Sequence, residues 1–257
     1  MMTDNKHISA DKAPFSGKRA VQGMIFAAGL GTRFKPWTDK HPKALAVVNG
    51  KSLLQRNIEF LQQYGITNVV VNVHHFADQI VDALQQNKGW GSHISISDET
   101  DMVLETGGGL KKAEPLFTAD TIVVINVDIL TDLDLGKVIA FHEQERPLST
   151  IAITDRMTSR YFLFDGSDTL CGWRNTKTGE ERIARPATTY LPRAFSGIHV
   201  ISKKLLSLIR HQGKFSIVDT YLELAANHTI KGFDHSGSRF IDVGKPDSVA
   251  QAELLFA

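Results

Sequence analysis

The chain has 257 residues, 42% of them hydrophobic and 22% charged, and its 29 Lys and Arg nearly balance 28 Asp and Glu. The formal net charge of +1 excludes a general nucleic-acid or membrane-surface binder, because such proteins depend on a dominant positive field. The single cysteine, Cys171, cannot form an internal disulfide, which is typical of a reducing compartment and favours a cytoplasmic protein.

Residues 1–20 mix charges with Pro and Gly and contain no apolar stretch long enough for a signal peptide or a membrane helix. We interpret them as a flexible N-terminal extension. Residues 21–257 show no clear linker, internal repeat or low-complexity tract. We therefore expect a single domain there.

Apolar runs alternate with segments of helical spacing from Val21 onwards. The runs VQGMIFAAG, TNVVVNVHH and TIVVINVD are typical of buried strands. Between them, the spacing of Leu54, Ile58 and Leu61 predicts one helix, and a second is expected around residues 76–84. This order predicts an α/β fold with a doubly wound, mostly parallel, Rossmann-like sheet.

The pattern changes after about residue 148. Short strands with turns at Asp165–Gly166 and at 177–179 predict a small antiparallel insertion in the second half. The segment AFSGIHVIS then predicts a strand, and KKLLSLIRH and SIVDTYLELAANH predict helices. A final helix is expected after Pro246.

The loop after the first predicted strand carries two glycines, Gly29 and Gly31, followed by cations. Such loops are the usual phosphate sites of doubly wound sheets. The dinucleotide fingerprint would need a third glycine where Phe34 stands, and a P-loop would need one at Leu45. Neither standard phosphate motif is present.

The pattern that remains is G-x-G-T-R with Pro42-Lys43 following. Glycines let backbone N–H groups approach phosphate oxygens, while Arg33 supplies a fork of donors and Lys43 a point charge. Together with Ala27-Ala28, this pattern resembles the signature of the sugar-phosphate nucleotidyltransferases. The resemblance implies nucleotide contacts from the following residues: Ala27, Ala28, Gly29, Leu30, Gly31, Thr32, Arg33 and Lys43.

Two aspartates resemble the metal pair of that family. Asp128 follows the run IVVINV, and Asp242 stands in a late D-x-G. The resemblance implies that they hold Mg²⁺, which offsets the charge that develops when one phosphate attacks another. The residue before the first aspartate is commonly glycine in the family, and Val127 is expected to crowd the substrate there.

The stretch LETGGGLKKA places three glycines at a predicted helix start, where free N–H groups can contact a base edge or a phosphate. It most resembles the N-acetylmuramate-1-phosphate uridylyltransferase branch of the family, although heptose-phosphate guanylyltransferases share this style of loop. The resemblance implies further nucleotide contacts from Thr106, Gly107, Gly108 and Asn126.

The sequence indicates the residues that bind the sugar phosphate less clearly than those that bind the nucleotide. Many family members use Glu-Lys-Pro where this chain has Ala184-Arg185-Pro186, so Arg185 is expected either to contact the sugar phosphate or to be a solvated strand residue. The segment AFSGIHV resembles the family's T-G-I-Y strand. That resemblance implies Ser196 and Gly197 at the sugar pocket.

The resemblance implies Mg²⁺-dependent transfer of a nucleotidyl group, with UTP as the expected donor and an amino-sugar or muramate 1-phosphate as the acceptor, releasing pyrophosphate. The implied catalytic residues are Arg33, Lys43, Asp128 and Asp242. Three alternatives remain: a guanylyltransferase for mannose- or heptose-1-phosphate, a non-catalytic nucleotide-binding regulator, or transfer to a non-sugar phosphate such as phosphocholine. No nucleic-acid or membrane partner is expected, and the oligomeric state is open.

Overall fold

The structure, a computed structural model, describes residues 20–257. The predicted N-terminal extension, residues 1–20, therefore lies outside the described residues except for Ala20.

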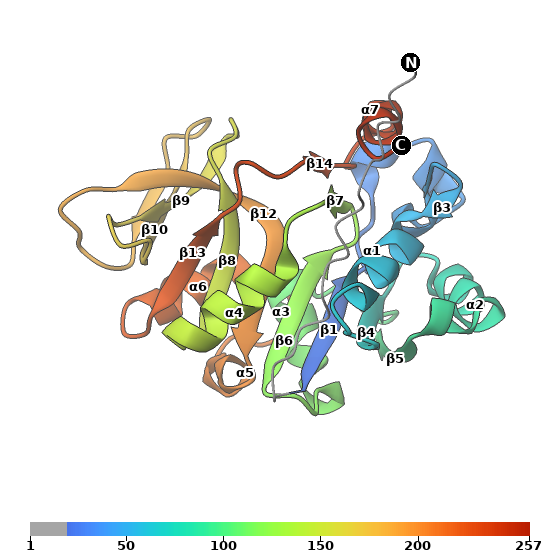
Figure 1. Cartoon of the computed structure of the whole chain (residues 1–257), viewed down its shortest axis with the longest axis horizontal. Helices are drawn as coiled ribbons and strands as arrows, with labels where there is room; N and C mark the ends of the chain where they lie inside the picture. Colours follow the sequence, from blue (N-terminus) through green and yellow to red (C-terminus); the bar gives the residue numbers. More distant parts are fainter. Residues whose placement is uncertain (1–19) are drawn as a thin grey trace, which may run out of the picture.

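Four parallel strands form one half of a ten-stranded sheet, in the order β6-β1-β4-β5 (Figure 1). Their bounds are β1 Val21–Phe26, β4 Asn68–Val73, β5 His93–Asp98 and β6 Thr121–Asn126. Valine and isoleucine fill these strands because the sheet is covered on both faces. Their carboxyl ends meet at one edge, so loops that follow different strands are brought together there.

The other half of the sheet is built around one long strand, β12 (Leu191–Ser202). Its second half lies antiparallel between β6 and β8 (Ser149–Thr154), and β13 (Ile230–Asp234) pairs parallel with β8. Its first half pairs antiparallel with β9 (Arg160–Phe164). From β9 the sheet continues through the antiparallel strands β10 (Leu170–Asn175) and β11 (Glu181–Ile183). This arrangement confirms the predicted α/β class with its antiparallel insertion.

Helices cover both faces of the sheet (Figure 1). One face carries α1 (Leu53–Gln62), α2 (Ala77–Gln86) and α4 (Leu135–Glu145), and the other carries α3 (Glu105–Lys112), α5 (Lys204–Leu208) and α6 (Ile217–Ala225). Two features of the sequence favour α1. Its apolar residues recur with helical spacing, and Ser52 caps its start by accepting from the N–H of Gln55 (3.1 Å).

Several short elements border the edge where the parallel strands end. These are β2 (Val47–Val48) with β3 (Lys51–Ser52), β7 (Ile129–Thr131) with β14 (Phe240–Asp242), and the last helix α7 (Asp247–Leu255). Single 3-10 turns lie at Thr32–Phe34, Trp37–Asp39, Lys43–Leu45, Lys88–Gly91 and Glu114–Leu116. The β7–β14 pair matters most, because it brings the distant Asp242 to the end of β6.

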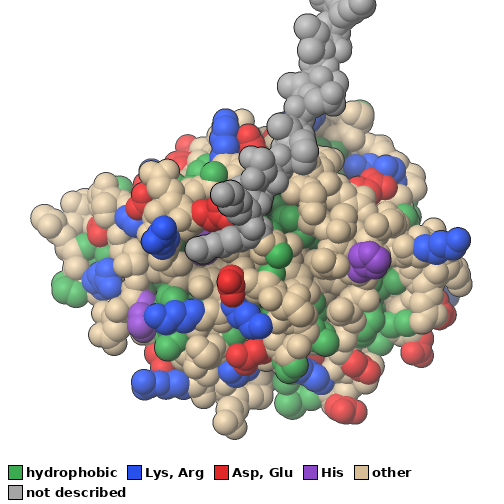
Figure 2. All heavy atoms as spheres, turned by 60° about the horizontal axis from the view of Figure 1, so that its bottom comes forward, with side chains coloured by type: hydrophobic (Ala, Val, Ile, Leu, Met, Phe, Trp, Pro, Cys, Tyr) green, Lys and Arg blue, Asp and Glu red, His purple; other side chains and the backbone are tan. Residues whose placement is uncertain are grey.

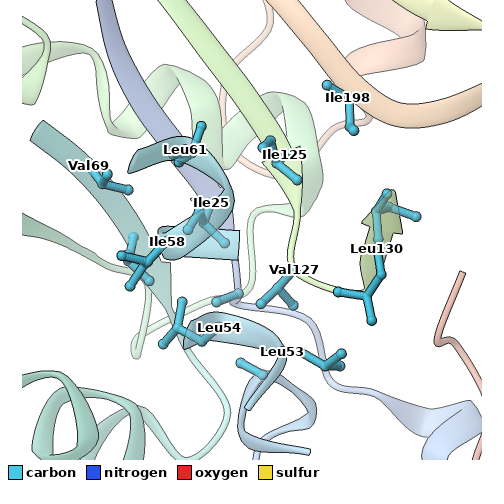
Figure 3. Packing of buried hydrophobic residues seen from close by; sticks show 14 of the residues in the cluster. Ile25, Leu53, Leu54, Ile58, Leu61, Val69, Ile125, Val127, Leu130 and Ile198 are labelled. Carbon is cyan, nitrogen blue, oxygen red and sulfur yellow. The ribbon is translucent and has the colours of Figure 1, made fainter. Parts of the chain in front are cut away.

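Val127 belongs to the core beneath that edge and not to the substrate side. Its side chain is 4% exposed and lies among Ile25, Leu53 and Leu54 (Figure 3). Side chains alternate along an extended chain, so Asn126 and Asp128 face away from this cluster. The expectation that Val127 crowds the substrate is therefore wrong.

The surface agrees with the balanced charge. Cations and anions are interspersed over the face that Figure 2 shows. Among residues 20–257, no helix is long and apolar enough to cross a membrane.

A buried polar chain crosses the core between β8, β12 and α6. Ser149 Oγ donates to the Tyr221 oxygen (3.0 Å), and the Tyr221 hydroxyl bonds to Nδ1 of His199. Burial lowers the pKa of His199 to about 3 and raises the pKa of Tyr221. His199 is thus neutral in the folded protein, whereas it takes up a proton below about pH 6.5 once unfolded.

The free energy of unfolding should therefore fall as the pH drops below about 6.5, because the unfolded state then binds more protons. We expect His199→Gln to lose less stability than the wild type between about pH 7.5 and about pH 5, measured by urea unfolding. The control is His93→Gln on the exposed end of β5, which should keep the wild-type pH dependence. An unchanged pH dependence in His199→Gln would contradict the assignment.

Candidate active site

The carboxyl ends of β1, β4 and β6 open into a cavity of about 390 Å³. Most residues predicted to bind the nucleotide line it: Ala28, Gly29, Leu30, Gly31, Thr32, Arg33, Lys43, Thr106 and Asn126. Asp128, predicted to hold the metal, lines it as well. Ala27 is buried directly behind the loop. The sequence did not point to the other residues of its lining: Phe26, Asn72, Glu99, Val103, Glu105, Lys214 and Gly244.

The loop after β1 is shaped by its second glycine. Gly31 has a left-handed backbone (φ 61°), and a Cβ atom there would lie 2.7 Å from Thr38 Cγ2. Its carbonyl oxygen accepts from Phe34 N–H (2.7 Å) and from Thr38 Oγ1 (2.9 Å). The Cβ position of Gly29, by contrast, has no described atom within 4 Å. The loop is thus held at Gly31 and open to a ligand at Gly29.

The start of this loop is held by a buried amide side chain. Asn72 Oδ1 accepts from the N–H groups of Ala27 (2.7 Å) and Ala28 (3.3 Å), and Asn72 Nδ2 donates to Glu99 Oε1 (2.7 Å). The other Glu99 oxygen accepts from Leu104 N–H (3.1 Å) at the start of α3. Burial raises the pKa of Glu99, which is fully buried, and the Asn72 bond opposes that shift.

Two aspartates and a lysine meet at the floor of the site. Lys43 Nζ donates to Asp128 Oδ2 in an ion pair whose side chains are only 13% and 14% exposed. Asp242 pairs in register with Ile129, the residue after Asp128, and Val243 N–H donates to the Asp128 carbonyl (2.8 Å). Burial, followed by the charge of Asp128, raises the pKa of Asp242.

Arg33 reaches the same centre from the loop. A Cβ atom at Gly244 would lie 2.8 Å from Asp242 Oδ1 and 3.2 Å from Arg33 Nη2. The absence of a side chain at Gly244 therefore lets the guanidinium approach the carboxylate. Burial and Asp128 still raise the pKa of Asp242, and the positive charge of Arg33 opposes that rise. The structure brings together Arg33, Lys43, Asp128 and Asp242, as predicted for the catalytic residues.

This donor set fits a divalent cation that is completed by its substrate. No cluster of three or more His, Cys, Asp and Glu side chains occurs within residues 20–257. Mg²⁺ is usually bound by one or two carboxylates with substrate phosphates and water. Two adjacent carboxylates, one of which resists ionisation because of its burial and the charge of the other, match that requirement.

The three glycines of α3 have a different role from the one expected. The N–H groups of Gly107 and Gly108 both donate to the Phe215 carbonyl (2.9 and 3.2 Å), so the prediction that they are free for the nucleotide is wrong. A Cβ atom at Gly108 would lie 2.2 Å from the Gly213 oxygen. These glycines instead allow α3 to pack against the 213–216 loop, which leaves Thr106 at the cavity.

The three residues predicted to contact the sugar phosphate, Arg185, Ser196 and Gly197, lie in different parts of the structure. Arg185 Nη2 donates to the His228 carbonyl (3.3 Å), just before the start of β13, whose first residue is in register with Ser149. That end of the sheet is opposite to the site, so the structure does not bring Arg185 to it. Ser196 is fully buried and hydrogen-bonds to His235 Nε2 (2.7 Å).

Gly197 does lie at the site. Its backbone is left-handed (φ 73°), and a Cβ atom there would lie 2.8 Å from Asn126 Nδ2. The register of β12 against β8 shifts around this residue. Gly197 thus allows Asn126 to lie against β12, two residues from Asp128.

Comparison with known proteins identifies this arrangement. The sequence pattern described as nucleotidyl transferase matches residues 22–163. The chain is 32% identical over 240 residues to the N-acetylmuramate alpha-1-phosphate uridylyltransferase of Caulobacter vibrioides, covering 91% of this chain and 96% of that protein. It is 41% identical over 114 residues to the enzyme of the same name from Neisseria meningitidis serogroup B, covering 44% of this chain and 49% of that protein.

Among solved structures, HddC from Yersinia pseudotuberculosis, in complex with GMP-PN, is 26% identical with a TM-score of 0.74. The match covers 92% of this chain and 99% of that chain.

The packing of α3 predicts that Gly108→Ala will destabilise the protein by about 1–3 kcal/mol, because the added methyl group meets backbone that cannot move aside. Urea unfolding measures the change. Gly166→Ala in the β9–β10 turn is the matched control, since no described atom lies within 4 Å of its Cβ position. Equal stabilities of the two variants would contradict this role of Gly108.

Proposed function

The chain belongs to the nucleotidyltransferase family, and from that premise we propose that it transfers a nucleotidyl group from a nucleoside triphosphate to a sugar 1-phosphate. The observation that carries the proposal is the meeting of the glycine loop, Arg33, the Lys43–Asp128 pair and Asp242 at one edge of the sheet. These groups come from four separate parts of the chain. Together they supply donors for a polyphosphate and carboxylates for a cation.

The reaction is an in-line displacement at the α-phosphorus. An oxygen of the acceptor phosphate forms the new bond to this phosphorus, and the bond from it to the bridging oxygen of the β-phosphate breaks. Both electrons of that bond leave with pyrophosphate, and the product is a nucleotide-sugar. No protein nucleophile is needed, so the residues act by positioning and by stabilising charge.

The described residues divide that work. The backbone from Gly29 to Thr32 faces the triphosphate, and Arg33 supplies a planar fork to its oxygens. Lys43 has two tasks, since it pairs with Asp128 and also lines the cavity. We propose that Asp128 and Asp242 hold Mg²⁺, which offsets the negative charge shared by donor and acceptor phosphates.

The donor UTP and an N-acetylmuramate-type acceptor are the finer part of the proposal. They are supported by the relative from Caulobacter vibrioides, which aligns over nearly its whole length. A guanylyltransferase is the second candidate, since HddC, of similar fold and length, was solved with GMP-PN. A cytoplasmic location belongs to the same proposal, because these substrates are cytoplasmic metabolites.

The test is pyrophosphate release with Mg²⁺ across UTP, GTP, CTP and dTTP, each against a panel of sugar 1-phosphates that includes N-acetylmuramate and mannose 1-phosphates. We expect turnover with UTP and the muramate compound. Turnover with GTP alone would favour the second candidate. Nucleotide binding without turnover on any acceptor would instead indicate a regulatory relative.

Asp128→Asn should lower kcat by about 10²-fold or more while the protein stays folded, because an amide is a poor ligand for Mg²⁺ and leaves Lys43 without its counter-charge. The rate is measured by pyrophosphate release at saturating Mg²⁺, and folding by urea unfolding. Asp82→Asn on the exposed side of α2 is the control and should keep the wild-type rate. A folded Asp128→Asn protein with full activity would refute the metal assignment.

A further inference from the structure

Arg156 approaches the catalytic aspartates from a segment that the sequence did not single out. It follows β8, whose last residue, Thr154, pairs with Ala194 near the end of the sheet where β6 terminates. Its Nη2 donates to the Phe195 carbonyl (2.9 Å), and its guanidinium carbon lies 5.2 Å from the centre of the Phe240 ring. These contacts fix the side chain between β12 and β14.

The position over Phe240 puts Arg156 on the side of β14 that carries Asp242. Phe240 and Asp242 are two residues apart in this strand, so their side chains point to the same face. Burial and Asp128 raise the pKa of Asp242, and the charge of Arg156 is among those that oppose this rise, which agrees with the placement. Arg33 lies against Gly244, two residues beyond Asp242. Two arginines thus flank this carboxylate, one toward each end of the strand.

Arg156 has donors to spare. Its Nε is buried and has no hydrogen-bond partner among residues 20–257, so it is closed to a ligand, whereas Nη1 is not buried and has no partner among those residues. Within the same range Arg156 forms no ion pair with a carboxylate at salt-bridge distance. Burial lowers its pKa, with Asp242 acting in the opposite direction. A half-buried guanidinium with spare donors is costly unless an anion completes its bonding. Its planar fork suits a phosphate monoester.

The surrounding residues place this fork in the acceptor half of the site. Arg33 lines the cavity with the glycine loop, whereas Arg156 is absent from that lining and bonds to the residue two before Gly197. Gly197 in turn lies against Asn126. Arg185, the basic residue expected to bind the sugar phosphate, lies at the opposite end of the sheet.

We propose that Arg156 binds the phosphate monoester of the acceptor and directs its oxygen toward the α-phosphorus, while Arg33 holds the donor. This inference rests on the proposed function. It adds the residue that recognises the second substrate.

The test is the steady-state KM for each substrate in Arg156→Gln, with the donor and acceptor that give turnover in the panel. We expect the acceptor KM to rise at least about tenfold and the donor KM to stay within about twofold, because a charge-assisted pair to the acceptor alone is lost. Arg156→Lys keeps the charge without the fork and should lie between wild type and Gln. Arg185→Gln is the matched control and should retain both wild-type KM values.

The KM values decide whether Arg156 binds the acceptor. An unchanged acceptor KM in both Arg156 variants, or an equal rise in both KM values, would overturn the assignment, since a residue that only supports Phe240 or Asp242 has no preference for the acceptor. If Arg156→Gln does not fold, the Lys variant supplies the same comparison. Absence of wild-type turnover with every acceptor would refute the proposed function and the inference with it, whereas turnover with an unshifted acceptor KM refutes the inference alone.

Discussion

The buried amide of Asn72 is the interaction on which the geometry of the site depends. It is 2% exposed and uses both its oxygen and its nitrogen, so it fixes the start of the glycine loop relative to Glu99. Glu99 in turn holds the first residue before α3. Leaving any one of these buried groups unpaired costs about 1–3 kcal/mol. The loop after β1, the end of β4 and the start of α3 therefore form one unit before any ligand arrives.

The electrostatics of the site impose a second constraint. Asp128 and Asp242 come from distant parts of the chain and are held side by side by the β7–β14 pair, although burial and the charge of Asp128 both oppose the ionisation of Asp242. Lys43 and the two flanking arginines compensate in part. The cation and the anionic substrates of the proposed function would relieve these unfavourable charge interactions. That is the usual arrangement of a phosphoryl-transfer centre.

The sequence predicted the placement of the glycine loop and Asp128 well, because each comes directly after a strand. The glycine loop and Asp128 each follow an apolar run that is typical of a buried strand, and the pairing of β1 with β6 puts them together. It misjudged α3, since a row of glycines looks the same whether it exposes its amides or lets two backbones touch, and only the Phe215 contact distinguishes the two. The role of Asn72 was not predicted for a related reason. A single polar residue inside an apolar strand does not indicate which groups it will hydrogen-bond.

The acceptor half was not predictable because one strand assembles it. β12 pairs with β9 through its first residues and with β8 and β6 through its last, and it changes register around Gly197. The position of a residue of β12 therefore depends on its pairing with strands that are distant in the sequence. Ser196 and Gly197 are adjacent, yet one faces His235 in the core and the other faces Asn126 at the site. Arg185 precedes β12 and bonds to the His228 carbonyl, whereas Arg156 follows β8 and bonds to the Phe195 carbonyl of β12. The strand pairing, and not the spacing of basic residues, therefore decides which arginine lies near Asp242.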